Sequence, residues 1–311
     1  MLIATHSGKF HADDVWGVTA LALLHPGSDI IRTRDPARIA TAEFAVDVGD
    51  VWDPAAGRFD HHQKGFANAR LSGVVYASAG LVWKSWGARC VALIAREHAA
   101  HTLTDTQAQD IAYAIDNDLV QYLDMADTGA ARSAPGGYGL SAIVTGFNPN
   151  WLDELQADSP EAVEALRLNQ FRRAMDVMRD VMINQVKYRV GSLLAVERVR
   201  AGRLLEDGRV LFLDNASLPW TGIVRNEMPK VLFVISYSHT ERRHLLHTVP
   251  AAADSFVARK DLPTAWAGLR DAALASVTGV PDAYFCHNAR FIAAAASFDG
   301  VLALARQALA E

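Results

Sequence analysis

The stretch LIATHSGKFHADDVWGVTALALLHPG, residues 2–27, decides the fold of the first part of the chain. Its apolar start, residues 2–5, is typical of a short buried strand, and residues 12–24 have the length and composition of a helix. The His-Pro-Gly run at residues 25–27 ends that helix, because proline removes a backbone donor and glycine favours the left-handed conformation at helix ends. A strand, a loop and a helix in this order predict the beginning of a parallel α/β sheet.

Two further apolar or β-branched runs, residues 30–33 and 44–48, predict more strands of this sheet. They alternate with stretches that favour helices, and residues 79–97 and 106–123 are two further helical candidates. This alternation is the pattern of parallel strands joined by crossovers. We therefore expect an α/β N-terminal lobe built on a parallel sheet.

The composition changes after this lobe. The run TGAARSAPGGY at residues 128–138 is rich in Gly, Ala and Pro, and it predicts a loop or flexible connector. From Ser159 and Pro160 onward, apolar residues recur at helical spacing and predict one long amphipathic helix with a core-facing stripe. The stripe consists of Val163, Leu166, Ala174, Val177, Met178, Val181 and Met182.

The last part of the chain has its own strand pattern. Residues 210–213, 231–237 and 245–249 predict strands of a second sheet, and residues 301–309 predict a closing helix. We expect a smaller α/β C-terminal lobe that the long helix joins to the first. The predicted domains are residues 1–130, a connector at residues 131–192, and residues 193–311.

Composition excludes several classes of protein. A chain of 311 residues that is 50% hydrophobic favours two lobes over one core, and a formal net charge of -5 lacks the basic excess of proteins that coat long nucleic acids. The two cysteines, Cys90 and Cys286, lie far apart in apolar surroundings, which argues against a disulfide framework or a thiolate zinc site. We find no secretory signal pattern and no run of about 18 apolar residues. We expect a cytoplasmic protein with no membrane partner, and a homodimer is left open.

Three clusters of histidine and carboxylate each follow a predicted strand. They are THSGKFHADD at residues 5–14, VDVGD at residues 46–50 and FDHHQ at residues 59–63. Ligands of open parallel sheets bind outside the carboxyl ends of the strands, so side chains from separate strand ends converge there. A fourth acidic site, AIDNDL at residues 114–119, lies within a predicted helix that we expect at the same edge.

The clusters contain six candidate metal ligands. Imidazole and carboxylate without thiolate suit manganese, which we favour, or magnesium better than a structural zinc. Two such ions need at least one bridging carboxylate and several terminal ligands. Asp47, alone at a strand end, is the best bridging candidate. The six residues are His6, His11, Asp13, Asp47, His61 and Asp116.

Each candidate also has a structural interpretation when it is taken alone. His6 could be a satisfied polar residue at a strand end, and His11 with Asp13 could simply cap the first helix. Asp116 could lie on a solvated helix face. Asp14 fits a capping role better than a metal role, because a negative charge at a helix start meets the helix dipole. The joint occurrence of all six favours a metal site.

The tripeptide Asp60-His61-His62, preceded by the other clusters in this order, resembles the DHH phosphoesterase superfamily of two-metal hydrolases. Further motifs are similar to the melanocyte-proliferating-gene family of metal-dependent exonucleases. The resemblance covers nearly the whole chain. Its motifs are THSGKFHADD, RTRDP at residues 32–36, VDVGD, GRFDHHQ, SAGL at residues 78–81, AIDN, SFVARKDLPTAWAGLRD at residues 255–271 and FCHNARFIAA at residues 285–294.

The resemblance implies a role for each ligand candidate. His6, His11 and Asp13 would serve one metal, Asp47 would bridge, and a further pair, His61 and Asp116, would complete the second. His62 would face the phosphate and donate to it as negative charge accumulates. Asp60 would orient the neighbouring histidines.

The same resemblance implies that the C-terminal lobe closes over the first and holds the rest of the substrate. His287 and Arg290 are candidate substrate contacts, since Arg binds phosphate oxygens in bidentate pairs. The family is richer in glycine where this chain has Ala289 and Arg290, which limits how closely the backbone approaches a phosphate. In the first lobe, Arg32 and Arg34 flank a predicted strand end, so one could reach the cleft while the other faces solvent. Of the two, Arg34 is our substrate-binding candidate.

The function implied is a metal-dependent phosphodiester hydrolase that trims RNA or short oligonucleotides from 3′ to 5′. In this mechanism two metals activate a water that attacks phosphorus in line. One alternative is a phosphoesterase that acts on small nucleotides, with which the acidic net charge is compatible. The other is a catalytically silent module that keeps the metal and binds RNA or serves as a scaffold.

Overall fold

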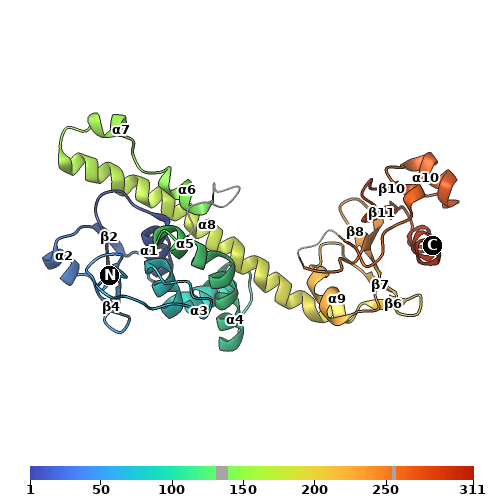
Figure 1. Ribbon diagram of the computed structural model, residues 1–311, viewed down its shortest axis with the longest axis horizontal. Coiled ribbons are helices and arrows are strands. Elements are labelled where there is room, and N and C mark those ends of the chain that lie inside the picture. The colour runs from blue at the N-terminus through green and yellow to red at the C-terminus, as the bar shows by residue number, and fades with distance from the viewer. Residues whose placement is uncertain (131–138, 254–256) are drawn as a thin grey trace. The chain divides into compact units, whose positions relative to one another are not determined.

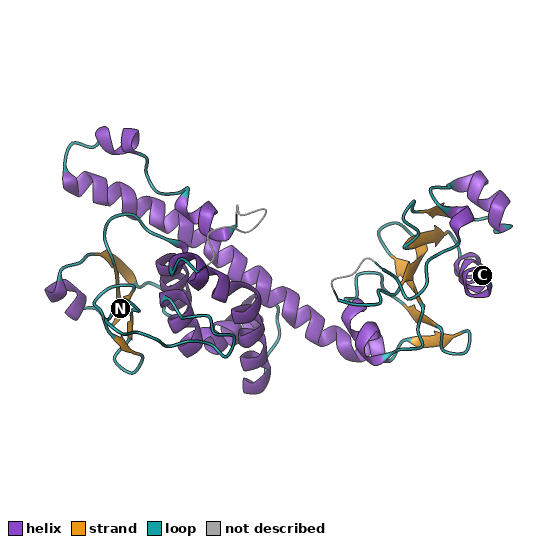
Figure 2. Ribbon diagram, viewed as in Figure 1, coloured by secondary structure: helices purple, strands orange, loops and turns teal. Residues whose placement is uncertain are grey.

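The computed structural model describes residues 1–130, 139–253 and 257–311 (Figure 1). The loop predicted at residues 128–138 therefore lies mostly outside the described residues. The chain divides into two compact units, Met1–Val190 and Gly191–Glu311, and the boundary lies inside one long helix, α8 (Pro160–Arg200). Both units combine helices with strands (Figure 2), which confirms the α/β prediction.

The strands described in the first unit form a five-stranded sheet in the order β2-β1-β3-β5-β4. The pairs β1/β2, β1/β3 and β3/β5 are parallel, as predicted, and β4 is an antiparallel edge strand that the sequence did not predict. The strands are β1 (Leu2–Thr5), β2 (Asp29–Arg32), β3 (Phe44–Val46), β4 (Trp52–Asp53) and β5 (Arg58–Phe59).

Helix α1 (Ala12–Leu24) packs closely on this sheet. Its residues from Ala12 to Leu21 are all buried, as expected where apolar side chains lie on every side of the helix, and the two aspartates of its first turn are buried with them. A Cβ atom on Gly17 would lie 2.8 Å from Cγ1 of Val46, so only glycine permits this approach between α1 and β3. The close packing fixes the start of α1 beside the carboxyl ends of the strands.

Helices α3 to α6 and the part of α8 within this unit surround α1 and share its core, whereas α2 packs on β1 and β3 through Ile39 and α7 buries no side chain. The single helix predicted at residues 106–123 is instead divided by a π-helical turn, η1, and the predicted core methionines Met178 and Met182 are buried in α8. The helices are α2 (Pro36–Ala40), α3 (Ser78–His98), α4 (Asp105–Ile115), η1 (Asp116–Val120), α5 (Gln121–Asp127), α6 (Leu140–Thr145) and α7 (Trp151–Leu155).

The strands described in the second unit form a six-stranded sheet in the order β10-β11-β9-β8-β7-β6. Helix α11 covers one face through Val301 and Leu304, while Trp220 and Val224 cover the other beside β7 and β8. The elements are β6 (Arg203–Leu205), β7 (Val210–Leu213), α9 (Thr221–Glu227), β8 (Phe233–Ser238), β9 (Arg243–Thr248), η2 (Thr264–Trp266), α10 (Asp271–Thr278), β10 (Ala283–Cys286), β11 (Ile292–Ala295) and α11 (Phe298–Ala310).

Within the described parts of the chain, we find no helix with the length and apolar character needed to cross a membrane.

Candidate metal centre

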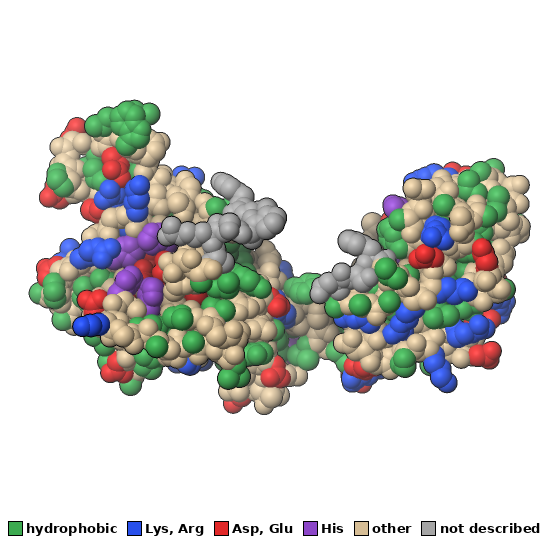
Figure 3. Space-filling model, in the orientation of Figure 1, with side chains coloured by type: hydrophobic (Ala, Val, Ile, Leu, Met, Phe, Trp, Pro, Cys, Tyr) green, Lys and Arg blue, Asp and Glu red, His purple; other side chains and the backbone are tan. Residues whose placement is uncertain are grey.

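The carboxyl ends of β1, β3 and β5 meet at one edge of the first sheet. His6 directly follows β1, Asp47 directly follows β3, and His61 lies just beyond β5. Because these strands are parallel, the three side chains converge at that edge. Figure 3 shows histidine atoms gathered beside carboxylate atoms on the surface of the first unit.

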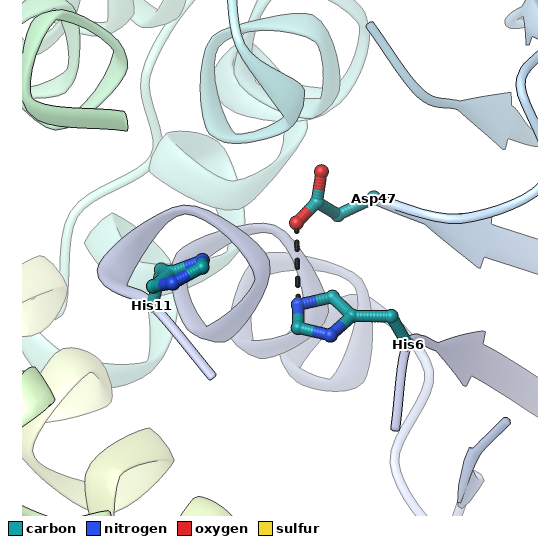
Figure 4. Close-up of side chains that lie close together, drawn as sticks. All are labelled: His6, His11 and Asp47. Atoms are coloured by element: carbon teal, nitrogen blue, oxygen red, sulfur yellow. Dashed lines mark ion pairs between the residues drawn. The ribbon is translucent and has the colours of Figure 1, made fainter. Parts of the chain in front are cut away.

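Asp47 lies between two imidazole rings. Its Oδ2 is 3.4 Å from Nε2 of His6 (Figure 4), and its Oδ1 is 3.4 Å from Nε2 of His61. Burial alone would raise the pKa of this carboxyl, but the two imidazoles outweigh burial and hold the pKa well below its usual range. Asp47 also adopts a positive φ of 56°, which is uncommon for a residue other than glycine and is found at functional sites.

His6 faces two buried carboxylates. Nδ1 of His6 donates to the carbonyl oxygen of Ser7, which leaves Nε2 3.3 Å from Oδ2 of Asp14 and 3.4 Å from Oδ2 of Asp47. Burial lowers the pKa of His6, yet the two carboxylates outweigh it and raise the pKa to about 10. These atoms therefore favour a cation between them, either a proton or a metal ion.

His61 has a similar environment. Its Nε2 is 3.4 Å from Oδ1 of Asp47 and 3.2 Å from Oδ2 of Asp127. Burial lowers the pKa of His61, and the carboxylates raise it to about 11. Nε2 of His61 is buried and has no hydrogen-bond partner among the described residues, and the same is true of Oδ2 of Asp14. Buried atoms that face an oppositely charged group but make no hydrogen bond fit a metal ion between them.

Asp13 is a buried carboxylate that helix α3 holds in place. Its Oδ1 accepts from the amide of Ala79 at 2.6 Å, and its Oδ2 accepts from the amide of Ser78 at 3.0 Å. Burial raises the pKa of Asp13 well above its usual value, and the carboxylates of Asp47 and Asp127 raise it further. A metal ion nearby would stabilise the charged form of this carboxylate.

Among the residues that the structure describes, three overlapping sets of side chains have ligand atoms close enough to share a metal ion. Asp47 belongs to two of the sets and His61 belongs to two, so neighbouring ions would share ligands. The nitrogen and oxygen donors of these sets suit manganese or magnesium. The sets are His6, His11 and Asp47; Asp47, His61 and His62; and Asp13, His61 and Asp127.

His11 is the most exposed member of the first of these sets. It precedes α1, and its backbone amide donates to Oδ1 of Asp14, which is the capping role predicted for Asp14. The side chain of Asn148 accepts from the amide of Phe10 and donates to its carbonyl oxygen, both at 2.9 Å. This pair of bonds fixes the backbone just before His11.

Asp116 is not brought into these sets. Its two oxygens each accept from the guanidinium of Arg70 at 2.7 Å. Asp127, at the end of α5, lies beside His61 and His11 instead, and it is absent from the six ligands predicted from the sequence. A signal was present, because an acidic residue in the last turn of a helix opposes the helix dipole and needs a compensating charge.

Asp60 organises the backbone around the two histidines. It is buried, and its Oδ2 accepts from the amide of Asp50 while its Oδ1 accepts from the amide of His62. Nδ1 of His62 lies 2.7 Å from Oδ1 of Asp60 and 3.5 Å from Oδ1 of Asp47. With Nδ1 donating to Asp60, Nε2 of His62 is left as the nitrogen available to a substrate.

A cleft of about 560 Å³ adjoins the cluster. It contains Asp47 and His62 together with two arginines, Arg34 and Arg58. The guanidinium of Arg58 donates to the backbone carbonyls of residues 42, 43 and 57, whereas Arg34 is exposed. The cleft is lined by Arg34, Pro36, Ile39, Ala40, Asp47, Val48, Gly49, Asp50, Val51, Arg58, Asp60 and His62.

Arg32 is not among the residues that line this cleft. Its guanidinium is buried between the rings of Phe10 and Phe171 and donates to the carbonyl oxygen of Gly8 at 2.6 Å. Arg32 therefore supports the loop between His6 and His11, and it is Arg34 that lines the cleft.

The two candidates in the second unit lie in the turn between β10 and β11. Arg290 has a positive φ of 59°, and its guanidinium donates to Asp261 at 3.1 Å and to Oγ1 of Thr264 at 3.0 Å. Nδ1 of His287 accepts from the amide of Ala289, so its Nε2 is the donor of this ring. The charge of Arg290 is thus partly compensated within the unit.

The similarity of this chain to solved structures is weak. RecJ from Thermus thermophilus in complex with Mg²⁺ aligns with all of this chain and with 50% of its own chain, at 13% identity and a TM-score of 0.28. This chain therefore spans about half the length of RecJ.

Comparisons with known sequences are stronger. The chain is 30% identical over 335 residues to the MYG1 exonuclease of Homo sapiens and 32% identical over 336 residues to that of Mus musculus, with 99% of this chain and 86% and 85% of the relatives covered. The MYG1 protein C694.04c of Schizosaccharomyces pombe is 30% identical, with 97% of its length covered. The model MYG1_exonuc, described as "Uncharacterised protein family (UPF0160)", matches residues 2–309. The chain belongs to this MYG1 family, as the resemblance of its motifs predicts.

Proposed function

We propose that this protein is a divalent-metal-dependent nuclease that hydrolyses phosphodiester bonds in RNA or short oligonucleotides from the 3′ end. The observation that carries the proposal is the position of Asp47, whose two oxygens face the imidazoles of His6 and His61. Membership of a family with relatives named exonucleases supports the same activity.

Two metal ions would be held by the residues around Asp47. His6, His11 and Asp47 would hold one, and Asp13, His61 and Asp127 would hold the other together with Asp47. Manganese is our first choice and magnesium the alternative, because the donors are imidazole and carboxylate. When bound, such ions lower the pKa of a water and stabilise the negative charge that develops on the phosphoryl oxygens.

The side chains of the cleft would position the phosphate. His62, held by Asp60 through Nδ1, would donate from Nε2 to a phosphoryl oxygen as charge develops. Arg34 would pair with a phosphate of the same substrate, since it is the exposed arginine of the cleft. Asp60 would thus act through His62.

The volume of the cleft bears on the length of the proposed substrate. The cleft volume of about 560 Å³ lies in the range of pockets that enclose a small ligand, which also favours a phosphoesterase acting on small nucleotides. We propose that the second unit binds the rest of a longer substrate near His287 and Arg290. A cytoplasmic location stays a prediction, and a homodimer stays an open alternative.

The test compares two substrates with metal-stripped protein. A short 5′-labelled RNA and bis-p-nitrophenyl phosphate are incubated with and without added manganese. Manganese-dependent shortening of the RNA in single-nucleotide steps is the expected result, and cleavage of the small ester alone would instead support the small-nucleotide activity. Bound manganese with no turnover of either substrate would contradict the proposed function.

The matched variants are Asp47→Ala and Asp110→Ala. Asp47 lies in the cluster, whereas Asp110 is an exposed residue of α4 in the same unit. Asp110→Ala should cleave RNA like the unaltered protein, and Asp47→Ala should not.

A further inference from the structure

The first turn of helix α3 lies behind the cluster, and its residues Ser78, Ala79 and Gly80 are buried. The first amides of a helix have no partner within the helix. The residue before the helix, Ala77, has no side chain that caps them. Carboxylates from other parts of the chain must therefore accept from these amides.

Two aspartates take this role. The amides of Ser78 and Ala79 donate to Asp13, and the amide of Gly80 donates to Oδ1 of Asp124 at 3.0 Å. The helix dipole adds a favourable interaction with both negative charges. The start of α3 thus fixes one carboxylate of the metal cluster and one carboxylate of α5, the helix that ends at Asp127.

Gly80 permits this arrangement. A Cβ atom at this position would overlap Oδ2 of Asp124 and crowd Nη2 of Arg70. Arg70 contacts Asp124 at 2.7 Å and holds Asp116 through two hydrogen bonds of 2.7 Å. The bond from Gly80 to Asp124 therefore braces α5 against the start of α3. Arg70 links Asp124 to Asp116 of η1.

The hydroxyl of Ser78 reaches the central carboxylate of the cluster. Oγ of Ser78 donates to Oδ1 of Asp47 at 3.1 Å, and both side chains are buried. Oδ1 is the oxygen that faces His61, while Oδ2 faces His6. The hydrogen bond from Ser78 therefore favours the rotamer in which Asp47 presents one oxygen to each imidazole.

Other helical hydroxyls in this unit behave differently. Oγ of Ser85 donates to the carbonyl oxygen of Leu81, and Oγ1 of Thr19 donates to that of Val15, each within its own helix. Ser78 lies at the start of α3, where no earlier helical carbonyl is available to its hydroxyl. Its bond to Asp47 thus serves the cluster rather than the helix.

We propose that Ser78 is a positioning residue that orients Asp47 to be shared by two metal ions. This inference rests on the proposed function and assigns it a residue outside the ligand sets. Partners that orient a ligand typically contribute about 10- to 100-fold to metal affinity or activity. Removing the hydroxyl should therefore weaken metal binding without unfolding the protein.

The test is calorimetric titration of the metal-stripped protein with manganese. Ser78→Ala should bind manganese about 10- to 100-fold more weakly than the unaltered protein. Its kcat on the labelled RNA should fall while KM stays the same, because the substrate contacts are intact. Ser85→Ala, which removes a hydroxyl from the same helix, should match the unaltered protein in all three quantities.

Thermal unfolding of the metal-free proteins separates positioning from folding. Ser78→Ala should keep a cooperative transition, and Ser78→Thr, which retains the hydroxyl, should recover most of the affinity. Unchanged manganese affinity in Ser78→Ala would overturn the inference, as would equally weak binding by Ser78→Ala and Ser78→Thr. If the unaltered protein itself binds no manganese, the proposed function fails and this inference fails with it.

Discussion

Oδ2 of Asp127 lies 3.2 Å from Nε2 of His61, at the point where helix α5 ends. The negative end of a helix dipole disfavours a carboxylate there, so the charge of Asp127 must be offset by its surroundings. His61 supplies this charge in the metal-free protein, and a metal ion would supply it when bound. Asp116 has instead a permanent cation, Arg70.

This difference predicts that Asp127→Asn changes metal binding, whereas Asp116→Asn changes stability. Asp127→Asn should weaken manganese binding strongly, because it removes a charged ligand. Asp116→Asn should leave the metal content unchanged and lower the free energy of unfolding by about 2 kcal/mol, since it weakens a charge-assisted hydrogen-bonded pair. Metal analysis and urea denaturation of both variants measure the two effects, and loss of metal from Asp116→Asn would contradict the assignment.

Substitutions of Asp47 and His62 should also differ in their effects on metal binding. Asp47→Ala should abolish activity and weaken metal binding together, because both imidazole partners lose their shared carboxylate. His62→Ala should lower kcat by about 100-fold, the typical effect of removing one donor to a developing charge, with metal content nearly unchanged. Single-turnover cleavage and metal analysis test this pair. Equal metal loss in both variants would show that His62 is a ligand instead.

Substitution of Arg34 or Arg290 should weaken substrate binding. Arg34→Ala should raise KM by about tenfold, the effect of losing roughly 1.4 kcal/mol of binding, with kcat nearly unchanged. Arg290→Ala should raise KM less, because the guanidinium of Arg290 already pairs with Asp261. Steady-state kinetics on short RNA provides both values. A larger effect at Arg290 than at Arg34 would move the main phosphate contact to the second unit.

The raised pKa values predict how pH affects the metal-free protein. His6 and His61 have pKa values of about 10 and about 11, above the ordinary value of about 6.5. The folded state therefore keeps protons that the unfolded state releases. This contribution to stability is complete below about pH 6.5 and is lost as pH rises through about 10 to 11.

Thermal unfolding between about pH 6 and pH 10 measures this dependence. The melting temperature of the metal-free protein should fall across that range, and a variant carrying His6→Gln and His61→Gln should show a shallower fall. Manganese affinity should rise over the same range, because a metal displaces these protons. A melting temperature that rises with pH would contradict the environment described for both histidines.

Much of the first sheet follows from local sequence. Residues 2–5 and 12–24 form β1 and α1 with the predicted ends, because apolar strands and well-terminated helices are strong local signals. Strand β3 ends at Val46, earlier than predicted, because Asp47 takes a left-handed φ that its apolar neighbours do not indicate. Strand β11, with the sequence IAAA, was not predicted, since alanine has little strand preference.

The sequence predicts those residues of the candidate site that follow the ends of strands. His6, Asp47 and His61 each follow a strand, and the sheet alone brings them together. Asp116 and Asp127 depend instead on how helices pack against that edge. The π-helical turn at Asp116–Val120 changes which side chains of this stretch face the cluster, and periodicity cannot reveal such a turn.

The most direct test of the central claim is the anomalous diffraction of crystals grown with manganese. We predict two manganese peaks that share the carboxylate of Asp47, one beside His6 and one beside His61. A single peak that does not touch Asp47, or bound manganese only at other side chains, would contradict the two-metal site.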